Sequence, residues 1–457
     1  MATKLDHCKI LPSSPNHNAQ ELTLPLTHFD IPFLQSDPDQ TLIFFDFQCS
    51  EPQFLDTILP GLKNSLSATL THFLPLAGNI LLPAGNSSMP VIRYLSGDSV
   101  SLTVARSDQN LSYLTANHPR AADEFYPCVP HLPPVTSSSA AAVFPAVALQ
   151  ITLFPQQGIC IGVAYYHAAG DASSIVNFIK SWAFVNKFGE EFYLKYGELV
   201  PVLDRTLVQD PDRLDSKAWN LVKDSRVLPV EMESTALPTN KVRSTFLLTQ
   251  NQVRNLKNYV FANNPNLDRV SSFVVITAHV WRCLVESDGG GGGGSDEAVF
   301  FMLAVDCRGR LRPPLPAAYF GNCVVAAVAE SRRGLLLEGK LGFLAAVESL
   351  AGAIGRVLHG EGGIVESAKW PLDFADFGGK YVVAVAGSPR FDLYEADFGW
   401  GRPRKCEYVH LDRERSISVA KSREFEGGFE IGLSRGEAEM EVFESAFHRG
   451  LEEILKM

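Results

Sequence analysis

The chain has 457 residues, of which 46% are hydrophobic and 20% charged, and its 40 Lys and Arg against 51 Asp and Glu give a net charge of −11. This composition supplies ample material for hydrophobic cores and excludes a wholly disordered chain. The acidic balance and the lack of a basic stripe exclude a typical nucleic-acid binder. At about 100–200 residues per domain, the length predicts two to four domains.

The sequence shows no feature typical of membrane insertion, export or metal binding. No apolar run reaches the roughly 18–20 residues of a membrane helix, and charged side chains interrupt residues 1–11, where a secretory signal would be apolar. The eight cysteines form no C-x-x-C pair and no zinc-binding spacing. We therefore expect a cytoplasmic protein with reduced thiols, no membrane contact and no metal.

The first half of the chain combines strand patterns with one clear helix pattern. Residues 41–47 form an apolar run typical of a buried strand. Residues 52–73 place apolar side chains three and four positions apart, which predicts an amphipathic helix with Pro60 as an irregularity. Further strands are predicted within residues 90–105, 143–154 and 159–166, and a loop within residues 129–141.

A new set of elements follows residues 199–241, which are rich in Pro, Asp and Lys and indicate a crossover between domains. Residues 289–294 are six consecutive glycines, which match G-x-G-x-x-G. Because a strand pattern follows them instead of a helix, they predict a flexible loop and no dinucleotide site. The other elements predicted here are strands at 243–248 and 298–305 and an apolar helix that ends near Val285.

The clearest candidate for chemistry is the segment Tyr166 to Asp171. His167 closes an apolar strand, and Asp171 opens a helix, where an aspartate commonly caps the first turn. Small residues follow His167 and leave space around its imidazole, and histidine titrates near neutral pH, as a general base must. A packed strand-end histidine beside a capping aspartate is the alternative, and His-x-x-x-Asp alone does not decide between them.

Two further segments hold residue types that are common in binding sites. In residues 397–401, Asp-Phe-Gly-Trp-Gly, glycines flank the tryptophan, which indicates either a fixed loop or a tryptophan that fills a core. Arg308 and Arg310 follow a strand, and either one pairs with a buried carboxylate or remains solvated. The Gly-x-Ser-x-Gly of many serine hydrolases and the Gly-Lys-Ser/Thr of a P-loop are absent.

Four motifs occur in a characteristic order along the chain. They are His-x-x-x-Asp at residues 167–171, Asp-x-Arg-x-Arg at 306–310, Tyr-Phe-Gly-Asn-Cys at 319–323 and Asp-Phe-Gly-Trp-Gly at 397–401. With the N-terminal Leu-Thr-His-Phe-Asp, they resemble the plant BAHD acyl-CoA-dependent acyltransferases over nearly the whole chain. The third motif is similar to the branch that acts on anthocyanin, flavonoid and other phenolic glycosides. Tyr166, where many relatives have a second His, and the glycine run depart from the family pattern.

The resemblance implies an α/β fold of two similar domains, each a mixed β-sheet flanked by helices, as in chloramphenicol acetyltransferase. The active-site channel would lie at their interface. The expected N-terminal domain spans residues 1–198 and carries the His-x-x-x-Asp motif. Residues 199–241 would be the crossover linker, and residues 242–457 the C-terminal domain with the Tyr-Phe-Gly-Asn-Cys and Asp-Phe-Gly-Trp-Gly motifs. A monomer without nucleic-acid or membrane partners is expected.

The resemblance also implies transfer of an acyl group from acyl-CoA to a sugar hydroxyl of a phenolic glycoside, with acyl-CoA as co-substrate and without a cofactor. His167 would be the general base that takes the hydroxyl proton as the oxygen attacks the thioester carbonyl. Malonyl-CoA is favoured as donor over hydroxycinnamoyl-CoA. Lys180, on the helix after Asp171, is a candidate to meet the malonyl carboxylate, and a solvated helix face is its alternative role.

The resemblance suggests roles for the remaining motif residues. Asp171 would point away from the channel and pair with Arg308. Asp397 would be structural in the same way, although this aspartate is often counted with the histidine and the first aspartate as catalytic. The expected substrate-binding residues are Ser388, Arg390 and Trp400, and the expected structural supports are Arg308, Gly399 and Gly401.

Two other functions remain open from the sequence. A catalytically silent binding or scaffold protein could have the same fold, although the intact His167 and Asp397 motifs disfavour it. A hydrolase could use His167 to activate water, and it would release CoA thiol without an acceptor.

Overall fold

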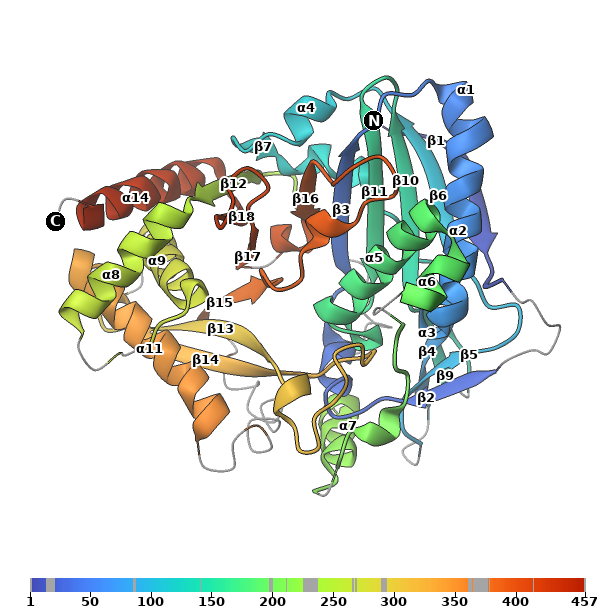
Figure 1. Ribbon diagram of the computed structural model, residues 1–457. Helices are drawn as coiled ribbons and strands as arrows, with labels where there is room; N and C mark the ends of the chain where they lie inside the picture. Colours follow the sequence, from blue (N-terminus) through green and yellow to red (C-terminus); the bar gives the residue numbers. More distant parts are fainter. Residues whose placement is uncertain are drawn as a thin grey trace.

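The computed structural model shows two halves, each built on a β-sheet with helices packed against it (Figure 1). We call residues 2–224 the N-terminal half and residues 237–455 the C-terminal half. The structure describes residues 2–13, 21–84, 88–139, 141–196, 200–210, 212–224, 237–264, 267, 269–288, 294–360, 364, 377, 379–413 and 415–455.

The N-terminal half is built on a six-stranded sheet whose strand order is β1-β6-β10-β11-β3-β16. Its two faces are covered by different cores, so β3 alternates between them: Leu42 and Phe44 belong to one core, and Ile43 and Phe45 to the other. Because both faces are buried, every residue of β10 and β11 is buried as well. The strands are β1 (Ala2–Ile10), β3 (Asp39–Asp46), β6 (Val100–Ser107), β10 (Val147–Phe154), β11 (Gly158–Tyr165) and β16 (Lys405–Tyr408).

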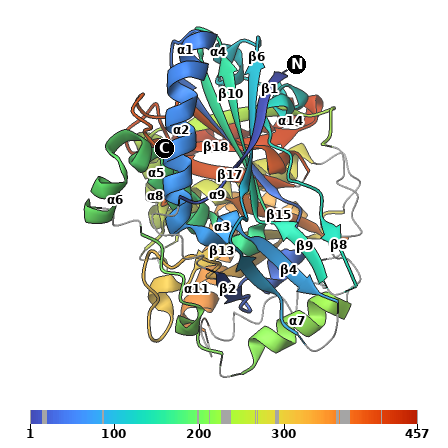
Figure 2. The same ribbon diagram turned by 90° about the vertical axis from the view of Figure 1, so that its right-hand side faces the viewer.

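A five-stranded sheet of order β2-β5-β4-β9-β8 lies at one end of the six-stranded sheet (Figure 2). Its strands are β2 (Leu22–Pro25), β4 (Asn79–Pro83), β5 (Val91–Tyr94), β8 (Thr136–Ser137) and β9 (Ala141–Pro145). The helices of this half are α1 (Glu51–Gln53), α2 (Leu59–His72), α3 (Leu74–Ala77), α4 (Leu111–Leu114), α5 (Ala172–Phe188), α6 (Glu190–Tyr196) and α7 (Leu214–Asp224). Of these, α2 and α5 pack against each other.

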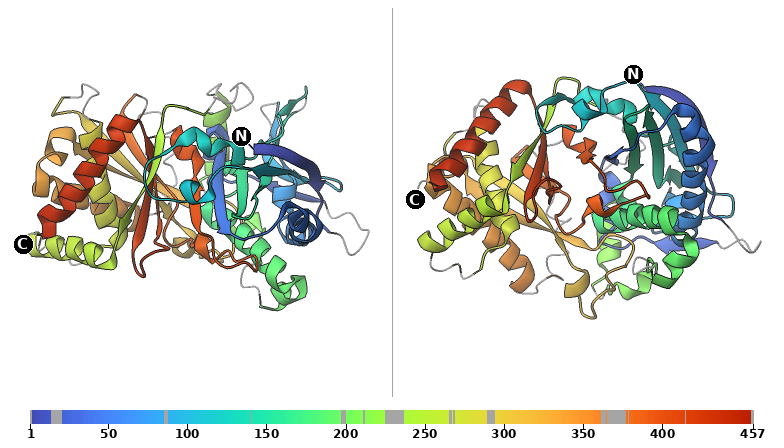
Figure 3. Two further views of the ribbon diagram at one scale, coloured as in Figure 1. Left: turned by 90° about the horizontal axis from the view of Figure 1, so that it is seen from above. Right: turned by 45° about the horizontal axis from the view of Figure 1, so that its top comes forward.

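The C-terminal half is built on a seven-stranded sheet of order β14-β13-β15-β17-β18-β12-β7. Its long helices cover the face that points away from the N-terminal half (Figure 3). The strands are β7 (Arg120–Ala121), β12 (Val242–Leu248), β13 (Ala298–Asp306), β14 (Val324–Arg332), β15 (Tyr381–Ala386), β17 (Ser416–Lys421) and β18 (Phe429–Arg435). The helices are α8 (Gln250–Asn263), α9 (Ser272–Ser287), α10 (Arg333–Leu336), α11 (Gly339–His359) and α14 (Glu437–Leu455).

Each half contributes a short strand to the sheet of the other half. Strand β7 comes from the N-terminal half and pairs with β12, with Arg120 opposite Arg243. Strand β16 comes from the C-terminal half and pairs with β3, with Tyr408 opposite Thr41. The exchange brings charged residues from both halves together, and Glu407 of β16 accepts hydrogen bonds from both arginines.

Most of the predicted elements are confirmed. The strand expected at residues 41–47 is β3, the strands within 90–105 are β5 and β6, and the strands before and after residue 156 are the β10–β11 hairpin. The helix expected at residues 52–73 is present as α1, a π-helical turn and α2, and Pro60 directly follows the π-helical turn, whose Leu59 N–H donates to the Phe54 carbonyl.

Three details differ from expectation or lie outside the described residues. Part of the expected loop at residues 129–141 forms the edge strand β8, and α7 lies within the expected crossover, packed against the 3₁₀ helix η1 (Ile31–Gln35). Of the six-glycine run, residues 289–293 lie outside the described residues. The domain boundaries expected from the sequence stay a prediction.

Helix α11 is long and apolar enough, by length and composition, to cross a membrane, so the expectation that no segment has this property is wrong. In the structure α11 packs against β14 and α9. Its buried face includes Phe343, Val347 and Leu350, which belong to the core of the C-terminal half. Its apolar composition therefore serves that core.

Candidate active site

The His167 loop lies between β11 and α5. Residues His167–Ala169 form a single 3₁₀ turn, and the Asp171 side chain accepts a hydrogen bond from the Ser174 N–H at 3.1 Å, so the predicted N-cap is confirmed. Gly170 is required by space, because a Cβ there would lie 2.9 Å from the Cβ of Ser174. The small residues after His167 and the Asp171 cap thus let the chain bend sharply after β11, and His167 lies at this bend.

Arg308 fixes the other side of this loop. Its two terminal nitrogens donate to the two carboxylate oxygens of Asp171 at 2.8 and 2.9 Å, so the pair is bidentate, and both residues are 3% exposed. Burial by itself would lower the pKa of Arg308, but the adjacent Asp171 outweighs burial and raises it above the usual value. The pairing that the resemblance implies is therefore present in the structure.

The loop of residues 319–323 holds the same bend through its backbone and one amide side chain. The Cys323 N–H donates to Asp171 at 3.1 Å, and the Asn322 side-chain amide donates to the carbonyl oxygen of His167 at 3.0 Å. Asn322 also donates twice to the fully buried Asp30 of the N-terminal half. The sequence marked this segment as a motif, and the structure shows its contact: it locks the His167 backbone to the C-terminal half.

The His167 imidazole is stacked on Phe33, with ring centroids 3.9 Å apart and an interplanar angle of 18°. Its Nδ1 is buried and has no hydrogen-bond partner among the described residues. Since the side chain is 21% exposed, Nε2 is the ring nitrogen that a substrate can reach. Nε2 lies 4.0 Å from an oxygen of Asp39, which accepts a hydrogen bond from the Tyr165 hydroxyl at 2.9 Å.

Sequence reasoning missed Asp39. The available signal was an acidic residue directly before an apolar strand, but many surface aspartates share that position. Only the pairing of β3 with β11, which places Asp39 opposite Tyr165, shows that this carboxylate lies beside His167.

Asp397 lies at the opposite end of α5 from Asp171. Its carboxylate pairs with Lys187 at 2.6 Å and accepts hydrogen bonds from the N–H groups of Gly399 and Gly401. Lys187 follows Asp171 by 16 residues (187 − 171), or about 24 Å along a helix. Asp397 therefore supports the loop and lies far from the bend that carries His167.

The glycines of this loop are needed for its shape. Gly399 and Gly401 have φ angles of +104° and +98°, in the region that side chains with a Cβ avoid. Partial burial alone would raise the pKa of Asp397, but Lys187 and the two glycine N–H groups outweigh it and lower that pKa. Both glycines thus donate to Asp397 from a backbone conformation that favours glycine, and their expected supporting role stays a prediction.

Trp400 belongs to an aromatic cluster between the Asp397 loop and β3. Its ring lies 5.6 Å from that of Phe45, 5.1 Å from Phe47 and 5.6 Å from Phe398. Phe398 in turn packs edge-on against the fully buried Trp182 of α5. These contacts fasten a loop of the C-terminal half onto the N-terminal half, and contact of Trp400 with a substrate stays a prediction.

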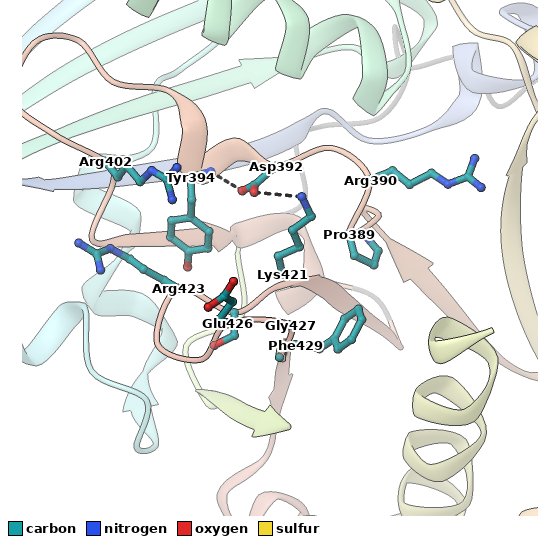
Figure 4. A pocket seen from close by; sticks show the side chains of 12 residues that line it. Pro389, Arg390, Asp392, Tyr394, Arg402, Lys421, Arg423, Glu426, Gly427 and Phe429 are labelled. Carbon is teal, nitrogen blue, oxygen red and sulfur yellow. Dashed lines mark hydrogen bonds and ion pairs between the residues drawn. The ribbon is translucent and has the colours of Figure 1, made fainter. Parts of the chain in front are cut away.

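Arg390 lines a cavity of about 820 Å³ beside the β17–β18 hairpin (Figure 4). Ser388 does not line it, and its hydroxyl accepts a hydrogen bond from the Arg390 N–H at 3.3 Å. Within the cavity Lys421 pairs with Asp392 at 3.3 Å. The lining residues are Pro389, Arg390, Asp392, Tyr394, Arg402, Lys421, Ser422, Arg423, Glu426, Gly427, Gly428 and Phe429. Four cationic and two acidic side chains make this lining net positive.

Lys180 forms an ion pair with Glu395, close to the Asp397 loop. The hydrogen bond from Lys180 lowers the pKa of Glu395, so the carboxylate stays ionised and neutralises the ammonium. Lys180 is therefore a poor candidate to meet a malonyl carboxylate, and the helix-face role is the one that the geometry favours.

One group of possible metal ligands occurs among the described residues, formed by His28, Asp210 and Asp215. Asp215 accepts hydrogen bonds from the backbone and ring of His28, and Asp210 accepts them from the N–H groups at the start of α7. These bonds account for the cluster as the cap of α7, and we assign it no metal.

Comparison with known proteins places this architecture in a family. A model described as the transferase family matches residues 1–449. The chain is 41% identical to a malonyl-coenzyme:anthocyanin 5-O-glucoside-6'''-O-malonyltransferase of Salvia splendens, over 98% of this chain and 95% of that protein. It is 40% identical to phenolic glucoside malonyltransferase 1 of Nicotiana tabacum, over 92% of each chain. A coumaroyl-CoA:anthocyanidin 3-O-glucoside-6''-O-coumaroyltransferase 1 of Arabidopsis thaliana is 32% identical, over 98% and 97%.

Solved structures share the fold at lower identity. Vinorine synthase superposes with a TM-score of 0.68 at 20% identity, covering 97% of this chain and 96% of that one. TRI101 of F. graminearum, complexed with ethyl coenzyme A, superposes with a TM-score of 0.66 at 15% identity, covering 93% and 97%. The expected α/β fold of two sheet-based halves is confirmed.

Proposed function

The chain belongs to the transferase family of BAHD acyl-CoA-dependent acyltransferases, and from this premise we propose that it transfers a malonyl group from malonyl-CoA to a sugar hydroxyl of an anthocyanin or other phenolic glucoside. The observation that carries the proposal is the identity of 40% or more to two glucoside malonyltransferases over at least nine-tenths of the chain. The cytoplasmic location, the monomeric state and the domain boundaries expected from the sequence belong to the same proposal.

His167 carries the chemistry in this proposal. A sugar hydroxyl is a weak nucleophile at neutral pH, so Nε2 takes its proton as the oxygen attacks the thioester carbonyl carbon. The tetrahedral oxyanion then collapses, the C–S bond breaks, and CoA leaves as the thiolate, which takes the proton back from Nε2. Nε2 suits this role because Nδ1 is buried. Asp171 takes no part in proton transfer, since both its oxygens are bound by Arg308.

The net positive cavity beside β17 and β18 suits the anionic part of the donor. CoA carries several phosphate oxygens, and arginine and lysine side chains bind phosphate by charge-assisted hydrogen bonds. Arg390 and Arg402 both line the cavity, and the charge of Arg402 also acts on the nearby Glu395. This supports the expected role of Arg390 in donor binding, and Ser388 would act beside it through the backbone of that loop.

The choice of malonyl over hydroxycinnamoyl rests on the relatives, because the malonyltransferases are 41% and 40% identical and the coumaroyltransferase 32%. Lys180 does not support it, since Glu395 already neutralises the ammonium. A malonyl carboxylate would therefore need a cation other than Lys180.

The test supplies the purified protein with malonyl-CoA or p-coumaroyl-CoA and a set of phenolic and flavonoid glucosides, and reads free thiol and product mass. We expect a product heavier by one malonyl group, formed only with glucoside present. Product with the coumaroyl donor alone would overturn the malonyl assignment. Thiol release without acceptor would point to a hydrolase, and a folded protein inactive with both donors would point to a silent scaffold.

A further inference from the structure

Asp39 stands beside the reactive nitrogen of His167 and has no role in the family motifs. One carboxylate oxygen lies 4.0 Å from His167 Nε2, and the other lies 3.9 Å from Nδ1 of His410, in the turn after β16. Both separations are too long for a direct hydrogen bond. A carboxylate thus lies between two imidazoles without binding either one, and its side chain is 20% exposed.

The position of Asp39 is fixed by its strand. Asp39 begins β3 and lies opposite Tyr165 of β11, whereas β16 pairs with β3 only from Thr41 onward. The Tyr165 hydroxyl donates to Asp39 at 2.9 Å. Burial, and then the adjacent Asp39 charge, raise the pKa of Tyr165, so the phenol keeps its proton and remains a donor. The carboxylate is therefore held in place from β11 by the Tyr165 hydroxyl.

Asp39 has unused capacity to accept hydrogen bonds. An ionised carboxylate offers about four acceptor positions, and the Tyr165 hydroxyl takes one of them. The oxygen that accepts from Tyr165, Oδ2, also lies 4.0 Å from Nε2 and has a second acceptor position, while Oδ1 lies 3.9 Å from Nδ1 of His410. Because an ionised carboxylate can only accept hydrogen bonds, any group that binds Asp39 here must be a hydrogen-bond donor.

From this geometry we propose that Asp39 positions the acceptor by accepting a hydrogen bond from a second hydroxyl of the sugar, close to the hydroxyl that gives its proton to His167. A sugar carries hydroxyls on neighbouring carbons, so one can meet Nε2 while another meets Asp39 across the 4.0 Å separation. The negative charge of Asp39 also stabilises the imidazolium that forms during attack. The inference rests on the proposed function and adds how the same site selects a polyhydroxyl acceptor.

The test compares wild type, Asp39→Ala and Asp39→Asn on phenyl β-D-glucoside and on its 2-deoxy, 3-deoxy and 4-deoxy analogues, with malonyl-CoA as donor. Loss of a hydrogen bond to a charged group should lower kcat/KM of Asp39→Ala on the full glucoside about ten- to a hundredfold. One of the three analogues lacks the hydroxyl that faces Asp39. On that analogue the kcat/KM of wild type should already be lowered, and Asp39→Ala should lower it little further. Asp39→Asn keeps an acceptor oxygen and should affect kcat more than KM.

Asp37→Ala is the matched control, because Asp37 is an acid two residues away that pairs with Arg413 at 3.6 Å. It should leave the discrimination among the four glucosides unchanged. An equal loss for Asp39→Ala on all four acceptors, with an unchanged melting temperature, would overturn the inference and leave a structural role. Wild type without turnover on any glucoside would overturn the proposed function and the inference together, so the two failures are distinguishable.

Discussion

The two motif aspartates of this chain sit at opposite ends of α5 and differ in almost every physical respect. Asp171 is 3% exposed and is held by a bidentate arginine and two backbone N–H groups. Asp397 has a side chain that is 25% exposed and is held by one lysine and two glycine N–H groups. Only the first touches the loop that carries His167.

The comparison shows that membership in a motif does not fix what an aspartate does. A buried charge that loses its partner is strongly destabilising, whereas an exposed pair contributes little. Neither carboxylate approaches the imidazole as closely as Asp39 does. Substitutions that remove the partners of Asp171 should therefore cost much more stability and activity than substitutions at Asp397.

Arg308→Ala should have the largest combined effect on stability and activity. It leaves Asp171 buried without its counter-charge, which costs about 3–5 kcal/mol of the free energy of unfolding, and the released loop no longer presents His167. Urea unfolding and kcat/KM measured on the same sample check both losses. Arg308→Lys is the control, because it keeps the charge without the bidentate geometry. Its stability and activity should lie between those of wild type and those of Arg308→Ala. Full activity with an unchanged unfolding midpoint would contradict the account.

Glu407→Gln sharpens the comparison with a buried carboxylate that belongs to no motif. Glu407 is fully buried, which would raise its pKa, but Arg120, Arg243 and Lys405 lower it to about 2. Because this pKa is depressed, the stability it contributes is present above about pH 4.5 and is lost as the pH falls toward about 2. The variant should be less stable by about 3–5 kcal/mol at neutral pH and should lose this part of the acid dependence. Activity should fall far less than in Arg308→Ala.

Asn322→Ala tests the backbone lock on the His167 loop. It removes the hydrogen bond to the His167 carbonyl and one bond to Asp30, each from a buried group, and should cost about 1–3 kcal/mol of stability. Because His167 loses its orientation, kcat should fall more than KM rises. Thermal melts and steady-state kinetics check this, and equal changes in a surface control such as Lys217→Ala would refute the specific role.

Asp397→Asn should have the smallest effect. The amide oxygen can still accept from Gly399 and Gly401, and only the charge pair with Lys187 is lost, which is worth about 0.2–1 kcal/mol. The pKa of Asp397 is lowered, so this small contribution is present above about pH 3.9 and disappears as the pH falls through the lowered pKa. Turnover should stay near that of wild type. A loss of turnover as large as that of Arg308→Ala would contradict the claim that Asp397 matters less for activity than the Asp171–Arg308 pair.

Local patterns predicted the parts of the fold that depend on neighbouring residues. The apolar run of β3, the periodicity of α2 and the cap at Asp171 are all visible in short windows of sequence. The pairing of Asp171 with Arg308, 137 residues apart, came from family resemblance alone, because no window contains both.

The exchanged strands and Asp39 lay beyond sequence reasoning for a related reason. Strands β7 and β16 have two and four residues, too few to show a period. Asp39 gains its place only through the pairing of β3 with β11. Where function depends on the pairing of distant strands, local sequence patterns identify the residue types but not which residues lie beside them in the fold.

The most direct test of the account is the rate of malonyl transfer to phenyl β-D-glucoside by wild type, His167→Ala and Asp397→Asn, measured beside their melting temperatures. Loss of a general base should lower the rate of His167→Ala about 10²–10⁴-fold while its melting temperature stays close to that of wild type. Asp397→Asn should keep most of the activity. A His167→Ala variant that transfers malonyl at the wild-type rate would contradict the assignment of His167 as the base.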